Sequence, residues 1–96
     1  MDRAEVPNEY RVRLTQFTEH DLQGSFCSFT LGNTGAEGQG VFQVYPLDGG
    51  QCAVQIISPE EGRSDACRFL TQTEIDTIHF GVRPSDGIKE LRVRLL

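Results

Sequence analysis

The chain has 96 residues, a formal net charge of −5 and 38% hydrophobic residues. This length leaves room for one hydrophobic core, so we expect a single β domain over residues 1–96, and the hydrophobic content excludes a disordered chain. The sequence also lacks an apolar run near the roughly 20 residues that a membrane-spanning helix needs, and it lacks a leader pattern at its start. We therefore expect a cytoplasmic protein.

Charge is unevenly spread along the chain. Residues 15–79 carry nine acidic residues against two arginines, whereas residues 80–96 carry four basic residues against two acidic ones. An acidic protein is a poor general binder of nucleic acid, because such binding depends on clustered cations. We expect the partner to be another protein that reads the acidic middle surface, and not a membrane or a nucleic acid. The oligomeric state is left open.

Segments that alternate between apolar and polar residues follow one another at short intervals, which is typical of an all-β sandwich or barrel. Residues 10–14 and 27–31 have the pattern of half-buried strands. Residues 41–45 and 52–57 flank the turn Pro46-Leu47-Asp48-Gly49-Gly50, which predicts a hairpin. Both hairpin strands are apolar on nearly both faces, so we expect them in the middle of the fold.

The second half of the chain continues this pattern. Residues 66–71 predict a further strand, and a Thr-x-x-Glu capping box then predicts a short helical turn at residues 72–77. Two last strands, at residues 78–82 and 91–95, are separated by a Pro-Ser-Asp-Gly turn at residues 84–87. We therefore expect six or seven mostly antiparallel strands with at most one short helical turn.

Residues 32–40 contain four glycines. A glycine-rich stretch can cradle phosphate, but a phosphate-binding loop of this kind ends in Lys followed by Ser or Thr and leads into a helix. This stretch has no Lys and leads into the strand predicted at residues 41–45. We expect a flexible loop between strands, and the most mobile internal segment of the chain.

The chain has three cysteines, Cys27, Cys52 and Cys67, and no Cys-x-x-Cys motif, which argues against a zinc site and a disulfide framework. Each cysteine falls in phase with the apolar residues of its strand, which predicts buried, reduced thiols. A reducing compartment fits best, and one disulfide with a spare thiol in a secreted protein is the alternative. The two histidines, His20 and His79, offer no recognisable partner for a thiol or a metal. We expect no enzymatic activity, no cofactor and no metal.

Arginines near the two ends of the chain carry the sharpest functional hypothesis. Arg11 and Arg13 share one face of the first predicted strand, and Arg92 and Arg94 share one face of the last. If these strands pair, as the first and last strands of sandwiches often do, four guanidinium groups meet on one surface. His79, which is out of phase with its apolar neighbours, is a further recognition candidate. The alternative is that nearby acids neutralise the arginines in ordinary surface ion pairs.

The function that fits these features is a non-enzymatic protein-interaction module, such as an adaptor, an inhibitor or a regulatory subunit. Its binding residues would be Arg11, Arg13, Arg92, Arg94 and His79. The alternative is a regulatory domain that binds a small ligand or an anion through the same four arginines. An enzyme whose catalytic residues converge only in space is the third possibility.

Overall fold

The computed structural model describes residues 6–58, 67–82 and 89–96 of the chain. Six strands join one mixed sheet in the order β4-β3-β2-β1-β6-β5. Their bounds are β1 (Phe26–Leu31), β2 (Glu37–Pro46), β3 (Cys52–Ile57), β4 (Cys67–Phe69), β5 (His79–Val82) and β6 (Lys89–Leu95). The predicted all-β fold class is confirmed. The predicted turn at residues 84–87 lies outside the described residues.

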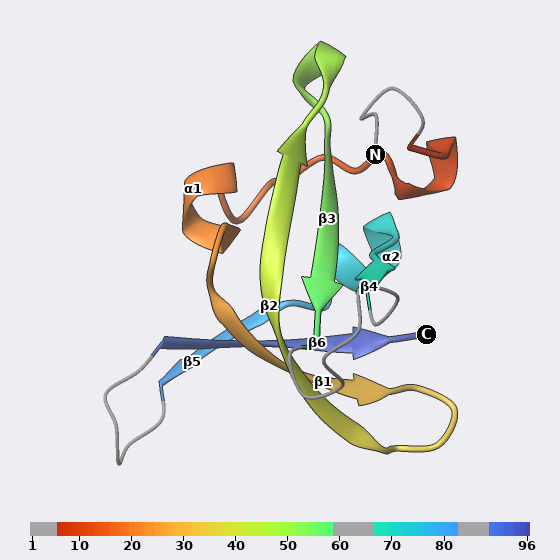
Figure 1. The fold of residues 1–96 in the computed structure, drawn as a ribbon, viewed down its shortest axis with the longest axis vertical. Coiled ribbons are helices and arrows are strands. Elements are labelled where there is room, and N and C mark those ends of the chain that lie inside the picture. The colour runs from red at the N-terminus through yellow and green to blue at the C-terminus, as the bar shows by residue number, and fades with distance from the viewer. Residues whose placement is uncertain (1–5, 59–66, 83–88) are drawn as a thin grey trace.

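The six strands form one coiled sheet, and not the two stacked sheets of a β-sandwich. Neighbouring strands are antiparallel except for β1 and β6, which are parallel. Figure 1 shows β2 and β3 running along the long axis of the molecule, while β5 and β6 cross them. The long strand β2 makes this possible, because its first half pairs with β1 and its second half pairs with β3.

The hydrophobic core lies on one face of this sheet. The strands contribute Cys27, Phe42, Val44, Cys52, Val54, Ile56, Leu91, Val93 and Leu95, and the covering segments contribute Val12, Leu22, Leu70, Ile75 and Ile78. Among the covering segments are two short helices, α1 (Glu19–Leu22) and α2 (Gln72–Ile75). Neither described helix is long and apolar enough to cross a membrane.

Both helices begin with a capping box. Helix α2 starts at Thr71 with Glu74 as the reciprocal partner, which confirms the helical turn predicted there. Helix α1 starts at Thr18 with Asp21 in the same role. The expectation of at most one helical turn is therefore wrong. The sequence pattern missed α1 because Asp21 fills the position that Glu or Gln usually holds in a capping box.

The segment at residues 10–14 is not a regular strand. Val12 forms an isolated bridge with Cys52, whose backbone oxygen accepts the Val12 N–H at 2.8 Å and whose N–H donates to the Val12 oxygen at 2.9 Å. The next N–H, that of Arg13, instead donates to the Gln72 side chain at 2.8 Å. Val12 is fully buried and anchors this segment to the core. No regular strand forms, because the backbone beyond Val12 bonds to a helix side chain and not to a strand.

The hairpin of β2 and β3 confirms the most specific local prediction. Its turn contains a short 3-10 segment at Asp48–Gly50, in which Gly49 and Gly50 have φ angles of 68° and 73°. Ala53 and Val54, which are consecutive in β3, are both fully buried. The hairpin therefore buries both faces at this point, as expected for strands inside the sheet.

Strand β2 begins at Glu37, inside the glycine-rich stretch, so the predicted loop is wrong for residues 37–40. An added Cβ at Gly38 would overlap the ring of Phe29, and one at Gly40 would lie 2.6 Å from the side chain of Ile56. Both glycines leave room for a neighbouring side chain to close over the strand. At these two positions glycine serves close packing within a strand.

Candidate functional site

The face of the sheet opposite the core carries polar side chains where β5, β6, β1 and the first half of β2 lie side by side. We call this surface the open face and define it by the residues Ser28, Thr30, Glu37, Gln39, His79, Glu90, Arg92 and Arg94. Except for the partly buried Ser28 and Glu90, these side chains are exposed. Three of the five residues predicted to bind a partner therefore lie on one surface.

Strand register arranges the first row of the open face. His79 on β5 lies opposite Arg92 on β6. Arg92 in turn lies opposite Ser28 on β1, because β1 and β6 are paired in parallel. Neighbouring strands are about 4.8 Å apart, so the imidazole and the guanidinium start from adjacent positions. A single ligand group can contact both.

A second row lies two residues further along the strands. Arg94 lies opposite Thr30 of β1, and Thr30 lies opposite Glu37 of β2. Glu37 is thus separated from Arg94 by one strand, or about 10 Å. The acidic residues Glu37 and Glu90 border the basic residues, while Arg92 and Arg94 stand about 7 Å apart on the same face of β6.

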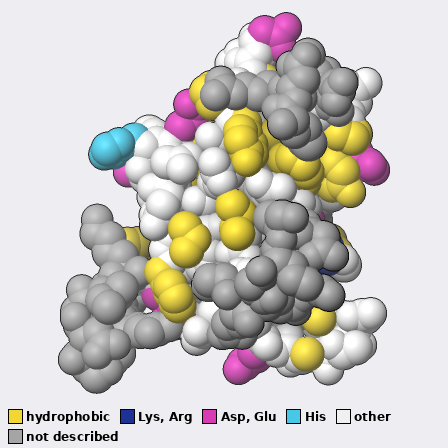
Figure 2. Space-filling view, viewed as in Figure 1, with side chains coloured by type: hydrophobic (Ala, Val, Ile, Leu, Met, Phe, Trp, Pro, Cys, Tyr) yellow, Lys and Arg dark blue, Asp and Glu magenta, His cyan; other side chains and the backbone are white. Residues whose placement is uncertain are grey.

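The guanidinium groups of Arg92 and Arg94 are exposed and make no ion pair with any residue in the described ranges. Figure 2 shows another aspect of the molecule, on which hydrophobic and acidic side chains are visible and Lys or Arg is almost absent among the coloured atoms. The other described arginines, Arg11, Arg13 and Arg68, lie at other elements of the fold.

Shallow cavities hollow the open face, and two of them border Arg92. One of about 470 Å³ is lined by Ser28, Phe29, Thr30, Glu37, Gln39, Glu90 and Arg92. The other, of about 490 Å³, is lined by Thr30, Thr77, His79, Arg92, Val93 and Arg94. Because Thr30 and Arg92 border both, the two cavities adjoin. Arg92 therefore lies between two hollows of the open face.

The other two predicted binding residues lie at the β2–β3 hairpin. Arg11 forms an ion pair with Asp48, and its Nε donates to the Gln51 Oε1 at 3.2 Å. The hydrogen bond from Arg11, together with its positive charge, lowers the pKa of the Asp48 carboxyl group. Arg13 Nη2 donates a long hydrogen bond of 3.5 Å to the Gly49 oxygen. The hairpin therefore supplies acceptors to both arginines.

The predicted pairing of the first and last strands does not occur. Strand β6 lies between β1 and β5, and the segment around Val12 is anchored to β3. The hypothesis that this pairing assembles four guanidinium groups on one surface is therefore wrong. Strand β6 pairs with β1 on one side, through residues 64 positions apart such as Cys27 and Leu91, and with β5 on the other, which leaves no position beside it for Arg11 or Arg13.

The described thiols are buried, as predicted. Cys27 and Cys52 are free and buried in the core. Burial, with the negative charge of Glu90 as a smaller cause, raises the pKa of the Cys27 thiol from its ordinary 9.0 to about 12. Burial also raises the pKa of Cys52. The side chain of Cys67 lies outside the described part of the structure.

Acidic, histidine and cysteine side chains do not gather into a metal-binding group of three or more in the described ranges. His20 is exposed on α1, where it follows Glu19. With Cys27 and Cys52 held in the core, neither thiol can meet His20 or His79 at the surface. The structure therefore places neither of these two thiols in a Cys–His pair.

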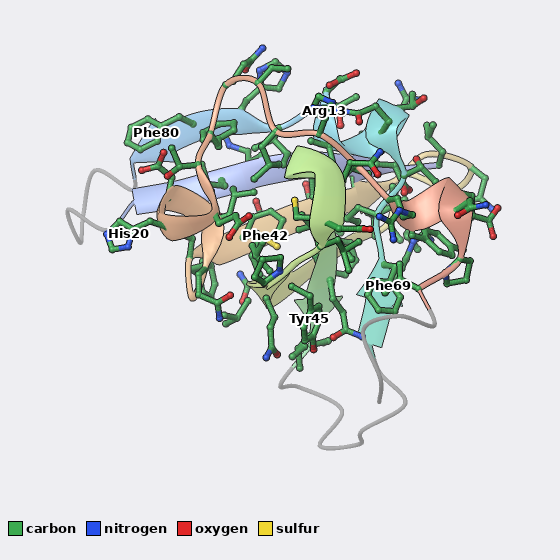
Figure 3. All side chains as sticks on the ribbon, turned by 90° about the horizontal axis from the view of Figure 1, so that it is seen from above. Arg13, His20, Phe42, Tyr45, Phe69 and Phe80 are labelled. Atoms are coloured by element: carbon green, nitrogen blue, oxygen red, sulfur yellow. The ribbon has the colours of Figure 1, made fainter. Side chains whose placement is uncertain are left out.

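Phe80 is a surface feature that the sequence pattern missed. It shares the apolar phase of Ile78, yet 56% of its surface is exposed. It borders a cavity of about 450 Å³ lined by Gln16, Phe17, His20, Asp21, Ser25, Phe80 and Leu91. Figure 3 shows Phe80 at the outer edge of the molecule, while Phe42 lies in its interior. The alternation of apolar and polar residues predicts which face of the strand Phe80 lies on. It does not predict that this strand, β5, lies at the edge of the sheet.

Glu74 is the second residue whose importance the sequence pattern understated. Its carboxylate is 1% exposed and accepts hydrogen bonds from the Thr71 N–H at 2.9 Å and the Leu96 N–H at 2.8 Å. It also accepts one from Arg68 Nη2 at 2.6 Å. The capping box predicted the first of these bonds only. Glu74 joins β4, α2 and the end of β6.

Comparison of the chain with protein-family models, curated proteins and solved structures found no match. The functional argument therefore depends on the geometry of the site.

Proposed function

We propose that this protein is a non-enzymatic interaction module that binds an acidic segment of another protein through the open face. The observation that carries the proposal is the state of Arg92 and Arg94, which are exposed on one face of β6 without an ion-pair partner among the described residues. Arginine forms planar, paired hydrogen bonds with carboxylates, so it suits recognition of acidic side chains.

The spacing of the basic groups favours a protein segment as the ligand. Arg92 and Arg94 are two residues apart on one strand, which separates their Cα atoms by about 7 Å. Alternate side chains of an extended peptide have the same spacing, so two acids of one partner segment can reach both arginines. His79 lies opposite Arg92 and adds a donor at one end.

The charge distribution supports the same ligand class. Like charges on neighbouring positions of a strand repel each other, and a carboxylate-bearing partner relieves this repulsion. The rest of the chain is acidic, with a net charge of −5 overall, so its field opposes an acidic partner everywhere except near the basic groups. The acidic surroundings thus restrict where such a partner binds.

The alternative of a small anion bound by four arginines has less support. It requires Arg11 and Arg13 beside Arg92 and Arg94, but the first pair is bonded to the β2–β3 hairpin. One of the two cavities beside Arg92 is also bordered by the carboxylates of Glu37 and Glu90, which repel a small multivalent anion. An extended segment can avoid these acids by placing uncharged residues opposite them.

The test is a fluorescence-anisotropy titration with a fluorescein-labelled octaglutamate peptide. We expect saturable binding that weakens as salt is raised from about 50 mM to about 200 mM, because exposed charges are then screened. The variant with Arg92→Glu and Arg94→Glu should not bind. A matched octalysine peptide is the control for non-specific attraction. Binding that is unchanged in the double variant, or that is equal for both peptides, would contradict the proposal.

Small anions provide the second arm of this test. Inorganic phosphate and pyrophosphate are added to the wild-type protein in a thermal-unfolding assay, since a ligand of the native state raises the melting temperature. We expect no rise at concentrations that leave peptide binding intact. A rise that depends on Arg92, without peptide binding, would favour the anion-binding alternative.

A further inference from the structure

We propose that the partner segment binds as an additional β-strand along β5 and places an apolar side chain beside Phe80. This inference rests on the proposed function, because the same segment supplies the acids for the open face. The occupant is an extended segment of a partner protein in which acidic and apolar residues alternate.

Strand β5 is at the end of the sheet order, and among the described strands it pairs with β6 alone. None of the other strands that the structure describes pairs with its outer side. In such an edge strand, alternate backbone N–H and C=O groups point away from the neighbouring strand and can pair with an extended segment. This is the geometry that recognition by strand addition uses.

The two faces of β5 differ in chemistry. Phe80 lies opposite the buried Leu91 and points to the core side, whereas His79 lies opposite Arg92 and points to the open face. Successive side chains of an added strand would fall on these two faces in turn. One set of side chains would contact Phe80, and the other would contact His79 and the positive charge of Arg92 next to it.

The core-side face offers a place for an apolar side chain. The cavity beside Phe80 has a volume of about 450 Å³, and Phe17, Leu91 and His20 also line it. Among the described large hydrophobic residues, Phe80 and Leu96 are the exposed ones. Exposed aromatic residues at the edge of a cavity commonly anchor a partner side chain.

On the open face, Arg92 brings positive charge towards β5, the edge strand. A Cβ added at Gly81 would lie 3.2 Å from Nη2 of Arg92, so the guanidinium extends over the backbone of β5 where glycine leaves room. The charge of β6 thereby reaches over the outermost strand. Acidic side chains of an added strand would come within reach of Arg92.

A second copy of the chain is a poorer occupant of this edge. Two copies that pair through β5 about a twofold axis would bring both sets of His79 and Arg92 to the same face. Like charges on adjacent strands are repulsive. Charge complementarity therefore favours an acidic segment of another protein.

The test begins with selection from a random 12-residue peptide display library on the immobilised full chain. We expect the enriched peptides to alternate acidic and apolar residues. The strongest of these peptides is then synthesised and titrated against the wild type, Phe80→Ser and Arg92→Glu. We expect each substitution to weaken binding about tenfold or more. Thr73→Ser, an exposed conservative change on α2, is the control and should bind like the wild type.

Strand addition has its own readout on the unchanged protein. Two versions of the peptide carry N-methyl groups at alternate residues, in one phase or the other. An added strand pairs through every second backbone N–H, so one version should lose binding and the other should retain it. Equal effects of the two phases would contradict strand addition.

The outcomes separate this inference from the proposed function. If binding of acidic peptides depends on Arg92 but not on Phe80 or on the phase of N-methylation, strand addition is overturned and the proposed function stands. If binding of alternating peptides depends on Phe80 and on the phase of N-methylation but not on Arg92, only the proposed function is overturned. A library without enrichment counts against both. Self-association of the wild type that Phe80→Ser abolishes would show that the edge serves a second copy, which contradicts the inference.

Discussion

The two arginine pairs near the ends of the chain have the same Arg-x-Arg spacing but different surroundings. Arg11 and Arg13 lie beside the β2–β3 hairpin, where Asp48, Gln51 and the backbone accept their hydrogen bonds. Arg92 and Arg94 lie opposite the hydroxyl-bearing residues Ser28 and Thr30 of β1, and Arg92 also lies opposite His79 of β5. Arg11 is paired with Asp48 and Arg13 makes one long hydrogen bond to the hairpin backbone, whereas Arg92 and Arg94 make no ion pair among the described residues.

This difference shows what strand periodicity can and cannot specify. The Arg-x-Arg spacing places two side chains on one face, but the residues on the adjacent segments decide whether their charges are neutralised. Those neighbours come from distant parts of the sequence, such as Asp48 for Arg11. If neutralised charges support the fold and the others serve binding, substitutions in the two groups should have opposite consequences.

The largest effect on stability is expected where a neutralising carboxylate is buried. Glu74→Ala removes the acceptor of bonds from Thr71, Arg68 and Leu96, so we expect the free energy of unfolding to fall by about 2–4 kcal/mol. Urea denaturation measures this change. The control is Glu37→Ala on the open face, which should change stability by less than about 0.5 kcal/mol. Equal losses in the two variants would contradict the distinction.

The next effect concerns the buried thiol beneath the open face. Because the pKa of Cys27 is raised to about 12, the folded protein keeps this proton while the unfolded chain loses it near pH 9. The folded state therefore binds more protons between these values, and stability should fall as pH rises from 9 towards 12. Cys27→Ala should make this decline shallower in chemical denaturation. An unchanged slope would show that the thiol does not contribute.

A smaller effect is expected at the basic residues of the open face. Arg92→Gln combined with Arg94→Gln should leave the free energy of unfolding within about 0.5 kcal/mol of the wild type, because exposed charges without partners contribute little. Thermal and urea unfolding test this expectation. A clear loss of stability would mean that these arginines support the fold.

The smallest effect is expected at the exposed ion pair of the hairpin. The lowered pKa of Asp48 means that its contribution to stability is present above the ordinary pKa of an aspartate and is lost as pH falls through the lowered value. Asp48→Asn should therefore slightly reduce the acid dependence of unfolding and leave neutral-pH stability nearly unchanged. A large loss at neutral pH would contradict a surface role for this pair.

Local patterns predicted much of the fold but only part of the site. The hairpin at Asp48–Gly50 and the capping box at Thr71 depend on neighbouring residues, so the sequence reveals them. The parallel pairing of β1 with β6 depends on long-range packing, and it decides that Arg92 faces Ser28. Gly38 looked like loop sequence because its packing partner, Phe29, is on another strand.

The central claim is tested most directly by comparing two double variants of equal charge. The affinity for the labelled octaglutamate peptide is measured for Arg11→Gln with Arg13→Gln and for Arg92→Gln with Arg94→Gln. Both variants lose two positive charges, so general electrostatic attraction falls equally. We expect the first to bind within about twofold of the wild type and the second to bind about tenfold or more weakly. Equal weakening in both would show that net charge, and not the open face, governs binding.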